Sequence, residues 1–150
     1  MKMSRTVAQE RIEGFIRQCR GLGVKITPQR VAIYRELLST DEHPSAEIIY
    51  KRIKNYYSNI SLTTIYRSLE TFEKLGIISV ANLLHDAARY DANLDHHHHL
   101  VCIVCKKVED FYDDFLANLG RTKKSIDNYK VLNYKVQING ICKICQKKRS

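Results

Sequence analysis

Four of the five cysteines form two Cys-x-x-Cys pairs, Cys102/Cys105 and Cys142/Cys145. Zn²⁺ prefers four thiolates in a tetrahedron, and each pair presents two sulfur atoms on one side of a tight turn. The spacing therefore predicts a structural zinc site on these four cysteines. Redox-active dithiols or unrelated surface cysteines are the alternatives. A redox pair usually opens a helix, and we expect neither pair to do so.

A run of four histidines, residues 96–99, precedes the first cysteine pair. In an extended segment side chains alternate, so His97 and His99 share one face. Two imidazoles in that arrangement form half of a site for a divalent metal, and carboxylates flank the run on both sides. Mixed nitrogen and oxygen ligands suit iron, manganese or zinc, and five of them suit iron or manganese best. A solvated polar turn is the alternative interpretation.

The elements that must position these residues follow from the spacing of apolar side chains. In the first ninety residues they recur at helical spacing, and Thr27, Ser45 and Ser61 stand where N-caps are expected. The predicted helices are residues 7–20, a second from Pro28 to about Leu38, 45–57 and 62–75; the predicted strands are 77–81 and 88–91, joined by a turn. This order is typical of a winged helix-turn-helix domain, with 62–75 as its recognition helix. Cys19 lies on the apolar stripe of the first helix, where we expect a small buried side chain.

The remaining chain predicts strands that carry the histidine run and residues 106–111, a helix at 113–126 and a half-buried strand at 129–138. We expect the chain then to turn at Asn139-Gly140, and the basic residues 147–149 to be disordered. The predicted fold class is α+β: a winged helix-turn-helix DNA-binding domain over residues 1–90, followed by a small α/β dimerisation and metal-binding domain over residues 91–150 with a four-cysteine zinc site.

Composition limits the partners. The formal net charge of +9, from 25 basic and 16 acidic residues, favours a polyanionic partner such as nucleic acid. No apolar stretch approaches the roughly 18 residues of a membrane span, and the N-terminal residues lack the apolar region of a secretory signal. We therefore expect a cytoplasmic protein with no membrane partner.

Five segments carry a resemblance to a known family. They are TPQR at 27–30, EHPSAEIIY at 42–50, SLTTIYRSLETFEKLGII at 61–78, DHHHHLVCIVCKKVEDF at 95–111 and GICKIC at 140–145. In order and spacing they resemble the ferric uptake regulator (Fur) family over nearly the whole chain. The resemblance implies a homodimeric transcriptional repressor that binds double-stranded operator DNA. It also implies a structural Zn²⁺ on the four paired cysteines and a regulatory Fe²⁺ or Mn²⁺ on His43, Asp91, His97, His99 and Asp110.

The position of Asp110 bears on the signal that is sensed. The iron-sensing members that this chain resembles carry Glu at this position, and the peroxide-sensing members (PerR) carry Asp. The resemblance thus implies peroxide sensing, in which bound ferrous iron and peroxide generate an oxidant beside His43 and His97. Arg67 favours the alternative, an iron-responsive or zinc-responsive repressor, because peroxide sensors often show Asn there. A further metal site of some iron sensors would need an acid at His98 and another near Ala117, so we expect that site to be absent.

The predicted recognition helix also carries candidate DNA contacts. Thr63, Thr64, Tyr66 and Arg67 fall off its apolar stripe, although a solvated face is the alternative. By resemblance, Tyr66 touches thymine methyl groups or the backbone, Arg67 a guanine edge or a phosphate, and Arg30 a phosphate. A metalloenzyme is the rival class, because a His/Asp site can activate water. A five-ligand hinge site leaves little room for substrate, so we predict no enzymatic activity and no small-molecule ligand besides the metal ion and peroxide.

Overall fold

The computed structural model describes residues 4–82, 87–122, 124–132 and 134–149. The chain divides into two compact units, Met1–Leu94 and Asp95–Ser150, and each is described by itself. No helix in the described part of the chain is long and apolar enough to cross a membrane.

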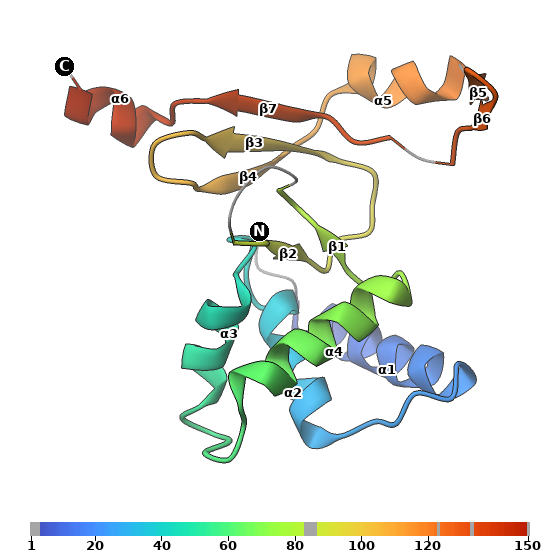
Figure 1. Ribbon diagram of the computed structural model, residues 1–150, viewed down its shortest axis with the longest axis vertical. Coiled ribbons are helices and arrows are strands. Elements are labelled where there is room, and N and C mark those ends of the chain that lie inside the picture. Colours follow the sequence, from blue (N-terminus) through green and yellow to red (C-terminus); the bar gives the residue numbers. More distant parts are fainter. Residues whose placement is uncertain (1–3, 83–86, 123, 133, 150) are drawn as a thin grey trace. The chain divides into compact units, whose positions relative to one another are not determined.

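The described residues of the first unit form four helices and then a short antiparallel hairpin (Figure 1). The elements are α1 (Arg5–Gly21), α2 (Pro28–Leu38), α3 (Ala46–Ile53), α4 (Leu62–Lys74), β1 (Ser79–Val80) and β2 (Tyr90–Asp91). Each helix begins after a hydroxyl side chain that accepts a hydrogen bond from the third helical N–H, as capping requires. The caps predicted at Thr27, Ser45 and Ser61 are thus confirmed. Beyond the C-cap Leu75 of α4, Gly76 (φ 68°) adopts the left-handed conformation that is typical of the residue after a helix.

The core of the first unit lies between these helices. Phe15 of α1 stacks on Tyr34 of α2 with ring centroids 4.4 Å apart, and Phe72 of α4 meets Phe15 edge-on at 5.0 Å. Cys19 is fully buried in the same cluster, as predicted for a small apolar side chain. This packing fixes α4 in the unit, and its other face remains exposed.

The third helix of the first unit is shorter than predicted, and the hairpin is closed by one asparagine side chain. The helix predicted at 45–57 ends at Ile53, because the Tyr56 and Tyr57 N–H groups both bond to the Ile53 carbonyl in a turn. The predicted turn at 82–87 lies mostly outside the described residues. At its base Asn82 accepts from the Arg89 N–H at 2.6 Å and donates to the Ala87 carbonyl at 3.0 Å, which closes the hairpin.

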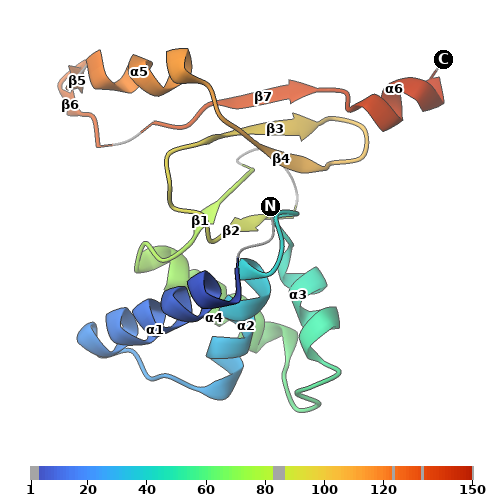
Figure 2. The same cartoon turned by 180° about the vertical axis from the view of Figure 1, so that it is seen from behind.

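The second unit is built on a mixed three-stranded sheet of order β4-β3-β7 (Figure 2). Its elements are β3 (His98–Cys102), β4 (Val108–Phe111), α5 (Asp114–Thr122), β5 (Ser125–Ile126), β6 (Tyr129–Lys130), β7 (Gln137–Gly140) and α6 (Lys143–Arg149). β3 is the central strand, antiparallel to β4 and parallel to β7. Four helices with a hairpin, followed by this sheet, confirm the predicted α+β class.

Four predictions for the second unit were wrong in detail. The helix expected at 113–126 ends at Thr122, because Asp127 and Asn128 (φ 45° and 68°) form a tight hairpin between β5 and β6. Among the described residues of the strand expected at 129–138, only β6 and the first two residues of β7 are regular. Asn139 and Gly140 are the last two residues of β7 and pair with β3, so the chain does not turn there. The basic residues 147–149 belong to α6 and are not disordered.

Candidate metal centres

The four paired cysteines come together in the second unit. Their sulfur atoms all lie within 4.8 Å of one another, and the Cys105 and Cys142 sulfurs are 3.7 Å apart. Thiolates about 2.3 Å from a tetrahedral Zn²⁺ lie about 3.8 Å from each other. The cluster therefore has the ligand type, number and spacing of a structural zinc site.

Strand ends place the two pairs. Cys102 is the last residue of β3, and the turn after it closes when the Lys106 N–H donates to the Cys102 carbonyl at 2.9 Å. The Ile103 N–H donates to the Gly140 carbonyl at 2.9 Å, so the first turn is tied to the end of β7. Cys142 follows two residues after β7 and immediately precedes α6. The parallel pairing of β3 and β7 thus carries both pairs to one end of the sheet.

Backbone donors prepare one sulfur for metal. The Cys142 N–H points at the Cys102 sulfur at 3.4 Å. This hydrogen bond, together with one from the Cys105 N–H, lowers the pKa of Cys102 to about 6, which favours the thiolate that a metal ion needs, whereas burial raises the pKa of Cys145. The expectation that neither pair opens a helix was wrong, because Cys142 precedes α6. Redox chemistry is instead disfavoured by the gathering of all four sulfurs.

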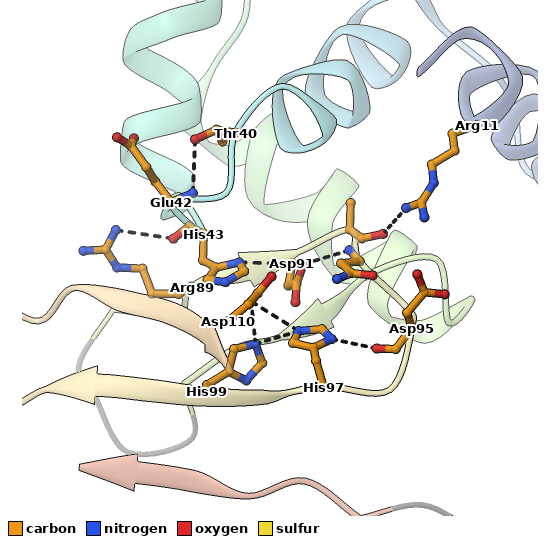
Figure 3. Close-up of polar contacts among 12 residues, drawn as sticks. Arg11, Thr40, Glu42, His43, Arg89, Asp91, Asp95, His97, His99 and Asp110 are labelled. Carbon is orange, nitrogen blue, oxygen red and sulfur yellow. Dashed lines mark hydrogen bonds and ion pairs between the residues drawn. The ribbon is translucent and has the colours of Figure 1, made fainter. Parts of the chain in front are cut away.

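A second cluster lies on the sheet of the same unit. The His97 Nε2 and His99 Nε2 atoms are 3.0 Å apart, and Asp110 Oδ1 lies 3.4 Å from the first and 3.6 Å from the second (Figure 3). His99 of β3 pairs with Asp110 of β4, and His97 immediately precedes β3. Nitrogen ligands about 2.1 Å from one ion and at right angles lie about 3.0 Å apart. The spacing therefore fits three ligands on one face of a metal ion.

The tautomer of His97 supports this fit. Its Nδ1 lies 2.6 Å from the Asp95 carbonyl, which can only accept, so Nδ1 carries the proton and Nε2 offers its lone pair. Metal-binding histidines commonly donate their second ring N–H in this way. His98 lies on the other face, as predicted: it is buried and accepts from the Val136 N–H at 3.3 Å. Its ring therefore anchors β3 to the segment before β7.

The first unit brings His43 and Asp91 together. His43 Nδ1 lies 3.7 Å from Asp91 Oδ1, and both side chains are buried. The Tyr90 N–H donates to the Pro44 carbonyl at 3.2 Å, which holds β2 against the segment that carries His43. This buried imidazole and carboxylate form a further, smaller group of side chains of the kind that bind metal ions.

Two arginines that the sequence analysis missed hold His43 in place. His43 has φ 49°, a left-handed conformation that a residue with a Cβ adopts only when its surroundings impose it. The Arg89 guanidinium donates to the His43 carbonyl at 3.4 Å. Arg52 bonds to Glu42, the residue before His43, at 2.9 Å and to Glu36 of α2 at 3.1 Å. Neither contact has a local sequence signal, because the partners come from different elements.

Replacing Arg52 by alanine is therefore expected to loosen His43. Arg52 is about one-third exposed, so its ion pairs contribute only about 1 kcal/mol to the free energy of unfolding. Manganese affinity should fall by about tenfold, the low end of the range for outer partners of metal ligands. Calorimetric titration with Mn²⁺ measures this. Lys51→Ala removes the same charge from the preceding, exposed position of α3 as a control, and equal affinities for the two variants would contradict this role for Arg52.

The exposed face of α4 carries most of the candidate DNA contacts. Thr63, Tyr66 and Arg67 are exposed there, the last two about one helical turn after the first. Thr64 is half-buried, and its hydroxyl lies 2.9 Å from the Ser61 hydroxyl at the N-cap. Arg30 lies in the first turn of α2 and donates to the Lys25 carbonyl at 2.6 Å. The structure thus places three of the five side chains on one surface of α4.

Comparison with known proteins identifies the family. The model of the ferric uptake regulator family matches residues 21–139. The chain belongs to this family. The peroxide-responsive repressor PerR of Staphylococcus aureus is 36% identical over 140 residues, which is 93% of this chain and 95% of that protein. Membership makes the protein a metal-dependent transcriptional regulator and not an enzyme.

Solved structures agree with this assignment. The Helicobacter pylori ferric uptake regulator, a protein with three functional metal-binding sites, superposes with a TM-score of 0.80 at 27% identity, covering 95% of this chain and 96% of that one. PerR from Streptococcus pyogenes is 31% identical with a TM-score of 0.52, covering 90% and 92%. The family fold therefore extends over both units.

Proposed function

We propose that the protein is a metal-dependent repressor that binds operator DNA as a homodimer and releases it when peroxide oxidises a metal-ligand histidine. The observation that carries this proposal is the convergence of His97, His99 and Asp110 on one point at metal-ligand spacing. The similarity to peroxide-responsive repressors over nearly the whole chain supports it.

One ion completes the proposed switch. His43 and Asp91 supply ligands from the first unit, and His97, His99 and Asp110 supply ligands from the second. Binding by both groups would favour one arrangement of the two units, and in a two-fold dimer this sets the separation of the two recognition helices. Operator half-sites about 34 Å apart, or a multiple of this, require one such separation. Metal then favours DNA binding by its differential affinity for that arrangement.

The ligand set fits Fe²⁺ or Mn²⁺, since it combines imidazole nitrogens with carboxylate oxygens. Ferrous iron held by these residues would lend one electron to cleave the peroxide O–O bond and would recover it as the imidazole is oxidised. In the net reaction one peroxide oxygen is added to an imidazole carbon and the other leaves as water. His43 and His97 are the proposed targets. His97 is held by its hydrogen bond to Asp95, so its ring stays beside Asp110 while the reaction proceeds.

Dimerisation is proposed through the second unit. β7 is an edge strand of the sheet, and Leu100 and Ile138, register partners on β3 and β7, are 37% and 40% exposed. Phe115, Tyr129 and Leu132 are also exposed by more than two-thirds. Unpaired strand edges with apolar side chains are typical of surfaces that pair with another chain. Zinc on the four cysteines would stabilise this unit.

Two alternatives keep the same class and change the signal. Arg67, where peroxide sensors often have Asn, favours an iron-responsive repressor, and the same ligand types also admit a zinc-responsive one. DNA binding by the iron-loaded and manganese-loaded protein, with and without peroxide, separates them. Peroxide should abolish binding with iron and leave it intact with manganese. Retained binding by the iron-loaded protein after peroxide would contradict peroxide sensing.

Arg67 itself offers a test of DNA recognition. Arg67→Ala should relax specificity at one operator position by about 1–3 kcal/mol if the guanidinium contacts a base edge. Binding to single-substitution operators measures this, and Lys74→Ala in the last turn of α4 removes the same charge as a control. An equal loss for all sequences, with a smaller salt dependence, would assign Arg67 to a phosphate instead.

A further inference from the structure

The hydroxyl of Tyr66 is not free on the surface of α4. The side chain is 43% exposed, yet its hydroxyl donates a hydrogen bond to Glu47 Oε1 of α3. The hydroxyl proton is thereby engaged inside the first unit. This bond raises the pKa of Tyr66 to about 12, so the proton remains in place at neutral pH. Tyr66 is thus exposed on α4 while its hydroxyl is tied to α3.

Glu47 is itself held in position. It is the second residue of α3, after the N-cap Ser45, where the helix dipole favours a carboxylate. The hydrogen bond from Tyr66 lowers the pKa of Glu47, and the positive charge of Arg89 acts in the same direction to a smaller extent. The carboxylate is therefore ionised at neutral pH, and its backbone is fixed by the capped first turn of the helix.

The contact bears on how an exposed ring can recognise DNA. A tyrosine on a helix surface samples several rotamers, and immobilising such a side chain on binding weakens affinity by about twofold to tenfold. A ring already held by Glu47 avoids this loss. The same carboxylate repels phosphates through its negative charge, so it should weaken binding to all DNA sequences alike. Glu47 should therefore improve discrimination between DNA sequences, because it holds the Tyr66 ring, and lower the affinity for all DNA, because its charge repels phosphates.

We propose that Glu47 is a positioning residue for operator recognition, which holds the Tyr66 ring in the orientation that contacts thymine methyl groups. This inference rests on the proposed DNA-binding function. By this inference Glu47, an acidic residue outside the recognition helix, contributes to sequence discrimination.

The test uses the duplex that the manganese-loaded wild-type protein selects from a randomised library. Each thymine is replaced in turn by deoxyuridine, which removes only the methyl group. The wild type should lose affinity when the methyl group is removed from the thymine that Tyr66 contacts, and we call this loss the methyl effect. Glu47→Ala should reduce the methyl effect about threefold, and it should bind random DNA more tightly than the wild type does. Tyr66→Phe keeps the ring but removes the hydroxyl, so it should also reduce the methyl effect. The double variant with both Glu47→Ala and Tyr66→Phe should show no further reduction of the methyl effect.

Two matched variants separate the hydrogen bond from the charge. Glu47→Gln removes the charge but keeps an oxygen that accepts from Tyr66, so it should restore the methyl effect. Glu70→Ala removes an exposed carboxylate from α4 itself, where Glu70 pairs with Lys74 at 2.8 Å, and should leave the methyl effect at the wild-type value. Thermal unfolding and manganese affinity show whether each variant is folded.

The outcomes are distinct. A folded Glu47→Ala protein with a wild-type methyl effect, or additive effects of Glu47→Ala and Tyr66→Phe, would overturn the inference and leave the proposed function intact. A wild-type protein that selects no sequence in the presence of manganese would instead contradict the proposed function itself.

Discussion

Replacing Cys142 by serine is expected to release the zinc and to unfold much of the second unit. The four sulfurs join the end of β3 to the start of α6, and a structural Zn²⁺ in such a site contributes on the order of 10–16 kcal/mol of apparent binding free energy. This is as large as the total stability of an ordinary small domain, about 5–15 kcal/mol. Dimerisation and DNA binding should be lost together with the zinc.

Zinc content by mass spectrometry, sedimentation and thermal unfolding measure this result. Cys19→Ala is the matched control, because Cys19 is buried in the first unit among α1 and its neighbours. It should lower the melting temperature slightly and leave one zinc per chain. A Cys142→Ser protein that is free of zinc but keeps the wild-type melting temperature and a normal dimer would contradict the structural role.

Treating the iron-loaded protein with micromolar peroxide is expected to add one oxygen atom to the peptide containing His43 or to the one containing His97. Loss of DNA binding should follow the same time course, since an oxidised imidazole is a poorer ligand. Peptide mass spectrometry and DNA binding on the same samples measure both. Manganese-loaded protein should show neither change, because Mn²⁺ does not readily reduce peroxide.

Asp110→Glu is the matched variant for this prediction. It keeps a carboxylate beside His97 and His99 but lengthens its reach, so metal-dependent DNA binding should persist while oxidation becomes slower. Unmodified histidines and intact DNA binding in the iron-loaded wild type would assign the protein to the iron-responsive branch. The fold and the zinc site would be unaffected by that result.

Local chemistry explains which elements could be predicted. The starts of α2, α3 and α4 follow from Thr27, Ser45 and Ser61, because an N-cap is a property of a few adjacent residues. The Asp127-Asn128 turn was missed, although two residues that tolerate positive φ are a local signal for a tight hairpin. The parallel pairing of β3 with β7 joins distant segments, and the local spacing of side chains does not specify it.

The candidate sites show the same division. The four cysteines and the pair His97/His99 could be predicted, since their spacing along the chain is the spacing that the ligand geometry needs. The contact of Glu47 with Tyr66 and the ion pairs of Arg52 could not, because α2, α3, α4 and the segment before His43 must first pack. Residues that position a functional side chain are therefore found from structure, and the functional side chains themselves from sequence.

The central claim is that a metal ion on the histidine and carboxylate ligands controls DNA binding. Its most direct test is the affinity of zinc-loaded protein for its selected duplex as free Mn²⁺ is raised, measured by fluorescence anisotropy alongside manganese content. We expect one manganese per chain beyond the zinc, and an affinity gain of about 5-fold to 150-fold that is lost in His99→Ala. Equal DNA affinity with manganese and with chelator, in protein that retains its zinc, would contradict the account.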